Sequence, residues 1–171
     1  MNIIENEMVY SERFNNIRVP EIKKVIGVNG TEREINEQCI HDIYRHVHKI
    51  VADYKYTPVD MNDMVTMLQV GNGAIVVEVE SSGLDRAERA MALLVERFKL
   101  ANCPLNQVKG LILHIQFTAE NFEPTWREYS TIEEVLFLHS SQDNSILMGF
   151  TDDGTGKEDT LTVTAIAIFQ D

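Results

Sequence analysis

Two aspartates, Asp60 and Asp63, stand three residues apart in "TPVDMNDMVTML", where an apolar, helix-like run begins. Asp at the N-cap of a helix and again at its third position is common, because both carboxylates satisfy free backbone N–H groups and the positive helix end. A carboxylate held in a fixed position can also orient a water molecule for attack. The pattern therefore has two interpretations: a helix cap, or a pair directed at something outside this chain.

The histidines lack the spacing of a metal site. Two histidines on one helix can bind the same metal ion when they stand at positions i and i+4 on one face. No pair among His41, His46 and His48 has that spacing. We interpret these three as solvated residues on a polar helix face, and His114 as a hydrogen-bonded residue on the less buried face of a sheet. The acidic segment "TDDGTGKEDT" lacks the calcium-loop pattern and is interpreted as a solvated turn. The sequence predicts no metal site.

An aromatic cluster occurs in "NFEPTWREYS", where Trp126 lies between Phe122 and Tyr129. Such a cluster either anchors a partner or packs a loop onto the domain. We favour packing, with the partner anchor as the alternative.

Composition and charge narrow the class of protein. The 171 residues are 44% apolar and 25% charged, which is typical of one soluble globular domain. The net charge of −12 argues against nucleic acid or an anionic membrane as a partner. Cys39 and Cys103 have no disulfide-framework or zinc-ligand spacing, and the N-terminus does not resemble a signal peptide. We therefore expect a cytoplasmic protein.

The first part of the chain is predicted to hold an arm and a long helix. Residues 1–30 form an N-terminal arm of uncertain structure, in which "IKKVIGV" is a candidate short strand. Residues 31–56 contain the leading helix, from Thr31 to about Tyr54, because Thr31 and Glu34 have capping-box spacing and apolar residues repeat every three or four positions.

Helices and strands alternate along the rest of the chain. A short helix starts at Asp60, the strand "AIVVEVES" follows, and the capping-box pair Ser82 and Asp85 opens the helix "RAERAMALLVERFKLAN", which Pro104 stops. The strand "VKGLILHIQFT" precedes the helix "TIEEVLFLHSS". Its expected buried residues are Ile132, Val135, Leu136 and Leu138. The last strands, "SILMGFT" and "TLTVTAIAIF", are joined by "DDGTGKED", whose turn residues suit a hairpin. The pattern predicts an α+β two-layer sandwich with a mixed, about four-stranded sheet.

The succession of "VDMNDM", "ESSGLDRAERAMALL", "VKGLILHIQF" and "SILMGFTDDGTG…LTVTAIAI" resembles the second, C-terminal domain of FtsZ, the bacterial relative of tubulin. The resemblance covers roughly residues 57–171 and, more loosely, the long helix. It implies that residues 31–171 are one domain of this kind, including the leading helix. The family binds GTP in a separate domain through a Gly-rich loop, which this sequence lacks. We therefore expect no cofactor, and no GTP hydrolysis by this protein alone.

The resemblance also gives the two aspartates a possible role. In FtsZ-like filaments, the loop after the central helix inserts two acidic residues into the nucleotide site of the next subunit, where they help to position the attacking water. Asp60 and Asp63 match these positions, although Pro58 stands where the family usually has Asn. The resemblance implies partner binding through Asp60, Asn62 and Asp63, with the two aspartates as a GTPase-activating pair in trans. The protein itself would be a non-enzymatic module that binds or caps a filament, or binds its own copies.

An alternative of another class is an oligomeric small-molecule-binding protein or enzyme with a site between subunits. It rests on fold analogy to chorismate mutase-like and imine deaminase-like proteins. The sequence shows no convergent nucleophile, base and electrophile to support it. A stable trimer would favour this alternative, whereas a monomer or dimer with an exposed loop at Asp60 would favour the interaction module. Because the chain ends at Asp171, directly after the last predicted strand, we do not expect membrane recruitment through a terminal peptide.

Overall fold

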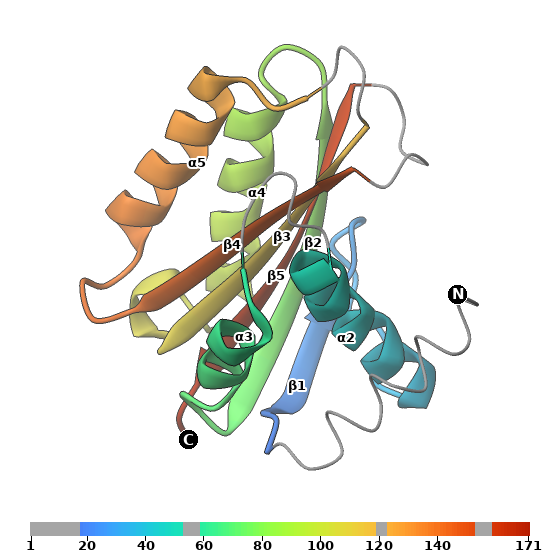
Figure 1. Ribbon diagram of the computed structural model, residues 1–171, viewed down its shortest axis with the longest axis vertical. Helices are drawn as coiled ribbons and strands as arrows, with labels where there is room; N and C mark the ends of the chain where they lie inside the picture. The colour runs from blue at the N-terminus through green and yellow to red at the C-terminus, as the bar shows by residue number, and fades with distance from the viewer. Residues whose placement is uncertain (1–17, 53–58, 119–122, 153–158) are drawn as a thin grey trace.

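A mixed β-sheet forms the centre of the fold, and helices pack on both of its faces (Figure 1). The structure is a computed structural model that describes residues 18–52, 59–118, 123–152 and 159–171. In chain order, the elements are β1 (Glu21–Ile26), α2 (Glu37–Ala52), α3 (Met61–Leu68), β2 (Gly73–Ser82), α4 (Arg86–Leu100), the short 3-10 helix η1 (Leu105–Gln107), β3 (Gly110–Phe117), α5 (Trp126–His139), β4 (Ser145–Asp152) and β5 (Thr160–Phe169).

The sheet has five strands in the order β1-β2-β5-β3-β4. The middle strand, β5, is antiparallel to β2 and β3, whereas β1 is parallel to β2 and β4 is parallel to β3. The predicted α+β class with a mixed sheet is confirmed. The sheet has one strand more than the four or so expected, because the candidate strand within residues 1–30 does form and becomes β1.

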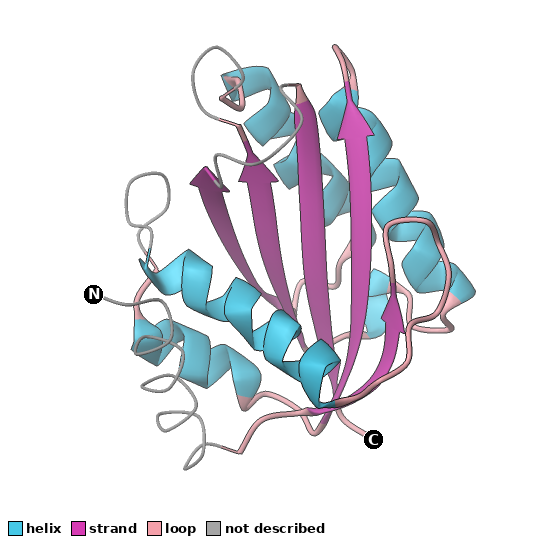
Figure 2. Ribbon diagram, turned by 90° about the vertical axis from the view of Figure 1, so that its right-hand side faces the viewer, coloured by secondary structure: helices cyan, strands magenta, loops and turns pink. Residues whose placement is uncertain are grey.

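Two helical layers cover the sheet: α4 and α5 lie on one face, and α2 and α3 lie on the other (Figure 1, Figure 2). Side chains alternate between the faces along a strand. Leu111 and Leu113 of β3 therefore join the core under α4 and α5, whereas Ile112 joins the core under α2 and α3. Because β3 is buried at every position, both faces of the sheet require a cover. The leading helix thus supplies part of a second helical layer.

The leading helix starts later than the sequence predicted. The hydroxyl of Thr31 donates to Asn29 Oδ1 at 2.7 Å, within the turn that follows β1, and it does not cap a helix. Asn36 Oδ1 instead accepts a hydrogen bond from the backbone N–H of Cys39 at 2.9 Å, and α2 begins at Glu37. The capping box predicted at Thr31 is therefore wrong. The predicted end near Tyr54 lies outside the described residues.

The capping box predicted at Ser82 and Asp85 is also wrong. Ser82 is the last residue of β2, and its hydroxyl lies 2.7 Å from the hydroxyl of Thr160, at the start of the neighbouring β5. Gly83 has a φ of 88°, a left-handed conformation that suits glycine in a sharp turn. Asp85 occupies the N-cap without a side-chain hydrogen bond, and α4 follows at Arg86. The Ser82 hydroxyl therefore pairs with Thr160 on the neighbouring strand and does not cap α4.

A capping box does occur at α5, where the sequence analysis did not place one. The Thr125 side chain accepts from the Glu128 N–H at 3.2 Å, and the Glu128 carboxylate accepts from the Thr125 N–H at 2.8 Å. The helix consequently starts at Trp126, earlier than predicted. Ile132 is buried as expected, but Leu138 is 67% exposed, so its predicted burial is wrong.

The predicted hairpin between the last two strands does not form. Among the described residues, β4 pairs only with β3, and β3 separates β4 from β5. The strand β5 is buried along most of its length, which suits the middle of a sheet, whereas the first residues of β4 are exposed, which suits an edge. Turn chemistry in the connection was therefore a poor guide to pairing, and residues 153–158 themselves lie outside the described residues.

The second helical layer lies very close to the sheet at Gly149 of β4. An ideal Cβ added to Gly149 would lie 2.4 Å from Cγ2 of Ile50, a fully buried residue of α2. Glycine in a strand often marks such a close approach. The absence of a side chain at Gly149 therefore sets how near α2 can lie to β4.

Replacing this glycine tests the contact. Gly149→Ala is expected to lower the free energy of unfolding by about 1–3 kcal/mol, because the added methyl group overpacks the contact with Ile50. In a strand with free space the same change would be favourable, since glycine weakens strands. Urea denaturation measures the difference. In an Ile50→Ala background the cost of Gly149→Ala should shrink, and equal costs in both backgrounds would contradict the explanation.

Candidate functional site

Asp60 is the N-cap of α3. Its backbone is extended, with φ −93° and ψ 169°, and its Oδ1 accepts a hydrogen bond from the N–H of Asp63 at 2.8 Å. The residue at the third helical position is therefore the one whose N–H the cap satisfies, as expected for this motif. The cap explains the spacing of the two aspartates and fixes the direction of the Asp60 side chain.

The predicted partner-binding residues share the exposed side of this helix start. Asp60, Asn62 and Asp63 are all exposed, whereas Met64 and Leu68 are buried against the sheet. Burial of the apolar side of α3 thus turns the polar residues outward. The structure brings these three residues together on one surface, which we call the acidic cap surface (Asp60, Asn62, Asp63).

A groove of about 440 Å³ adjoins the acidic cap surface. One wall comes from α3 and its flanks, and the other from the start of β4. The lining residues are Val59, Asp63, Thr66, Met67, Val70 and Ser145–Met148. Asp63 belongs to both features, so a partner bound at the carboxylate would also meet a wall of mixed polar and apolar character. The sequence analysis missed this groove because β4 is distant from α3 in the chain.

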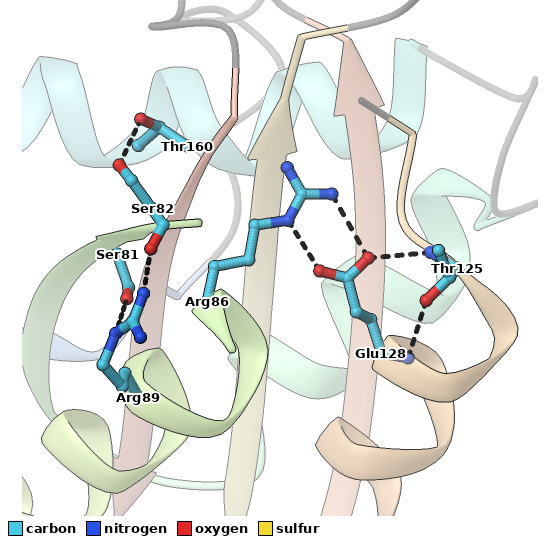
Figure 3. Close-up of polar contacts among 7 residues, drawn as sticks. All are labelled: Ser81, Ser82, Arg86, Arg89, Thr125, Glu128 and Thr160. Carbon is cyan, nitrogen blue, oxygen red and sulfur yellow. Dashed lines mark hydrogen bonds and ion pairs between the residues drawn. The ribbon is translucent and has the colours of Figure 1, made fainter. Parts of the chain in front are cut away.

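A second polar cluster lies at the opposite end of the sheet (Figure 1, Figure 3). Arg86 at the start of α4 donates from Nε to Glu128 Oε1 at 2.6 Å and from Nη2 to Oε2 at 3.2 Å. Both side chains are buried. The same Glu128 closes the capping box with Thr125, so one carboxylate joins the N-terminal ends of two helices. Arg89 adds hydrogen bonds to the Ser81 hydroxyl, at 3.1 Å, and to the Ser82 carbonyl.

The charge state of Glu128 follows from these contacts. Burial acts to raise the pKa of this carboxyl, but hydrogen bonds from Arg86 and Thr125 and the arginine charge outweigh it and hold the pKa below its usual value of 4.5. The group is therefore ionised at neutral pH and serves as a structural ion-pair partner. The sequence analysis missed this pair, although Thr125 and Glu128 have the capping-box spacing that could have revealed half of it.

The aromatic cluster divides between packing and exposure. Tyr129 packs on Phe150, with ring centroids 4.4 Å apart, as the packing interpretation expected. Trp126 is 87% exposed, so that interpretation is wrong for this residue. Its position at the first turn of α5 places it outside the helical face that packs on α4. Phe122 lies outside the described residues.

The histidines also divide. His41 is exposed, as predicted, whereas His48, also expected to be solvated, is half-buried. His46 is not a solvated residue, because its Nδ1 lies 2.8 Å from Nδ1 of His114. His114 is hydrogen-bonded as expected but 1% exposed, so its assignment to a less buried face is wrong. Across the described ranges, no three His, Cys, Asp or Glu residues gather as metal ligands, and no described helix is both long and apolar enough to cross a membrane.

The cap can be separated from the charge by substitution. Asp60→Ala is expected to lower the free energy of unfolding by about 1 kcal/mol, because the Asp63 N–H loses its acceptor. Asp60→Asn should stay close to the wild type, since Asn caps helices as well as Asp does. Thermal and urea denaturation of the two variants measure the difference. Equal stability of Asp60→Ala and the wild type would contradict the capping role.

Breaking the buried Arg86–Glu128 ion pair is expected to cost more free energy of unfolding than removing the Asp60 cap. Arg86→Met leaves Glu128 buried without this partner and is expected to cost about 3–5 kcal/mol. Arg127→Met is the matched control, because the Arg127–Glu88 pair is exposed at 3.3 Å and should contribute about 0–1 kcal/mol. The pKa of Glu128 is lowered in the folded state, so the cost of Arg86→Met should shrink as pH falls below 4.5. Urea denaturation at pH 7 and pH 4 measures both effects, and equal costs for the two substitutions would contradict this account.

Known structures share the fold of this chain, although no family model and no curated protein matches the sequence. An FtsZ mutant from M. jannaschii matches the structure with a TM-score of 0.64 at 17% identity, covering 77% of this chain and 38% of that chain. An empty FtsZ dimer from M. jannaschii gives 0.59 at 16% identity, with 78% and 40% covered. A protofilament of Bacillus thuringiensis serovar israelensis TubZ gives 0.52 at 13% identity, with 75% and 34% covered.

At these identities, the matches establish the fold and not the activity. They confirm the resemblance inferred from the sequence, because the mixed sheet and its helices reproduce the fold of the FtsZ C-terminal domain. The chain spans about two fifths of the length of the FtsZ chains that it matches. It therefore has the fold of part of an FtsZ-like protein.

Proposed function

We propose that this chain is a non-enzymatic interaction module that docks on a subunit of an FtsZ-type filament through the acidic cap surface. The observation that carries the proposal is the joint exposure of Asp60, Asn62 and Asp63 at the start of α3, on a chain with the fold of part of FtsZ. The matched structures include an FtsZ dimer and a TubZ protofilament, which supports a role in assembly in general.

The proposed role of the two aspartates is to act in trans. A carboxylate near a bound phosphate can orient the attacking water, directly or through a cation, without itself binding the nucleotide. Because the chain has a net charge of −12, contact with a phosphate-bearing site requires a cation on the partner side. Asp60 is well suited to such a role, because its cap hydrogen bond already limits its rotamers.

The groove beside Asp63 supports a docking role over a purely structural one. A cap alone needs no adjoining concave surface, whereas an interface combines a polar rim with an apolar part. Ile146, which is 38% exposed, provides apolar surface in the groove that Asp63 also lines. The alternative of a small-molecule site between subunits has no specific observation in its favour among the described residues.

The experiment measures GTP turnover and filament sedimentation of the FtsZ from the same organism. This chain is added at substoichiometric and equimolar amounts, as wild type and as Asp60→Asn/Asp63→Asn. The wild type is expected to change turnover, and the double variant to lose that effect, because asparagine retains the cap but removes both charges.

Glu133→Gln/Glu134→Gln is the matched control, because it removes two exposed charges from α5, on the other face of the sheet. It should act like the wild type. If the double aspartate variant also acts like the wild type, the aspartates are caps only. If neither the wild type nor the variants change turnover or sedimentation, the proposal fails, and sedimentation of the chain alone then tests binding to its own copies.

A further inference from the structure

A chain of three side chains connects α2 to the sheet in the interior of the second helical layer. His46 Nδ1 lies 2.8 Å from His114 Nδ1, and His114 Nε2 lies 2.6 Å from the hydroxyl of Thr151. His114 and Thr151 are buried, and their strands are neighbours in the sheet. These contacts join a helix to two strands across 68 residues of sequence between the two histidines.

The short distance between the two Nδ1 atoms limits how many protons the pair can hold. Only one hydrogen fits between them, so one imidazole donates and the other accepts. A first added proton leaves this hydrogen bond in place but puts a positive charge into a buried site. A second added proton places a hydrogen on both Nδ1 atoms and breaks the bond. The geometry therefore favours two neutral rings.

The charged groups around the pair act mostly in the same direction. From α2, Lys49 and Arg45 disfavour a further positive charge on His46, and Arg33, which precedes the helix, does the same. Asp42 opposes them. Burial is the largest effect, and together these groups lower the pKa of His46 to about 4.

On the sheet side, Glu78 of β2 lies in the same cross-strand row as Thr164 and His114, but it is paired with Arg33 at 3.2 Å. Burial, His46 and Lys49 place the pKa of His114 well below its usual value. Its hydrogen-bonding neighbour on β4 is Thr151, and its cross-strand neighbour on β5 is the buried Thr164. Threonine does not titrate in this range, so Thr151 and Thr164 place no negative charge beside His114.

We propose that His46, His114 and Thr151 form a proton-sensitive latch that holds α2 on the sheet at neutral pH and loosens it under acidic conditions. Ile50, one helical turn after His46, packs on Gly149 beside His114, so the latch lies next to a close contact between α2 and the sheet. When α2 lifts, both imidazoles reach water and take up protons with ordinary pKa values. Acid therefore favours the lifted state.

The sign and size of the effect follow from linkage. The pKa of His46 is about 4 when α2 is seated and about 6.5 when it is lifted, so the lifted state binds more protons between these values. The ratio of lifted to seated helix should rise about tenfold per pH unit over this window, and about 300-fold in total for His46 alone. Proton uptake by His114 would make the rise steeper.

Apolar contacts keep the lifted state rare at every pH. Helix α2 also buries five residues that remain apolar whatever the proton concentration: Cys39, Ile43, Val47, Ile50 and Val51. The latch therefore changes how often α2 opens, without converting the protein to a different fold. Docking at the acidic cap surface plays no part in this device, because that surface belongs to the start of α3, whereas the latch uses the sheet-facing side of α2.

The two cysteines supply a probe and an internal reference. Cys39 is buried between α2 and the sheet, whereas Cys103 is buried in the core on the other face. A disulfide reagent that reacts in mild acid, such as 4,4′-dithiodipyridine, measures the exposure of each thiol from pH 7 to pH 4. After correction for thiol reactivity, labelling of Cys39 should accelerate about tenfold per pH unit below about pH 6.5, while labelling of Cys103 should not.

Variants and a direct titration complete the test. His46→Gln/His114→Gln should remove most of the pH dependence of Cys39 labelling, with a smaller part left from His48, whose pKa is also lowered by burial. His41→Gln, an exposed change on the same helix, should keep the full dependence. An undiminished slope in the double variant, or parallel acceleration at Cys103, overturns the proposal. If the double variant does not fold, NMR titration of the wild-type imidazoles decides: a pKa of His46 near 4 supports the latch, and a pKa near 6.5 overturns it.

Discussion

The constraint on which the rest of this structure depends is a sheet whose inner strands are apolar on both faces. β5 lies between β2 and β3, and its side chains enter both cores: Val163 and Ala165 on one side, Ile166 and Ile168 on the other. Such a sheet is stable only when each face has a helical cover. Two helix pairs meet this requirement: α4 with α5 on one face, and α2 with α3 on the other. Their packing positions the acidic cap surface, the Arg86–Glu128 pair and the His46–His114 contact.

The two layers solve the problem of buried polar groups differently. Between α4 and α5, the Arg86–Glu128 pair remains charged, because each charge is hydrogen-bonded to the other and Thr125 adds a further donor. Between α2 and the sheet, His46 and His114 remain neutral, because burial and nearby cations oppose protonation. A satisfied polar pair in a low-dielectric interior fixes the register of the elements that it joins, but it also makes their contact sensitive to pH.

The proposed docking surface draws on the same packing. α3 is short, and its buried methionine and leucine side chains fix which of its sides faces outward. Asp60 then has two compatible uses: its Oδ1 satisfies the Asp63 N–H, and its exposed carboxylate presents negative charge beside a groove of mixed polar and apolar lining. A residue that stabilises a helix start is held in one orientation, which also favours recognition.

The sequence predicted most helices and strands, but it did not predict the strand order or the contacts between residues far apart in the chain. The strands, the apolar stripe of α4 and the helix that starts after Asp60 follow from periodicity and capping within a few residues, and the ordered blocks were sufficient to suggest the fold. The capping boxes predicted at Thr31 and Ser82 are wrong because each hydroxyl has another partner. Thr31 bonds to Asn29 within a turn, and Ser82 lies against Thr160 on the neighbouring strand. The strand order and the His46–His114 contact join segments far apart in the chain. Only the packing of two helical layers on one sheet decided them, because sequence spacing carries no information on which distant side chains meet.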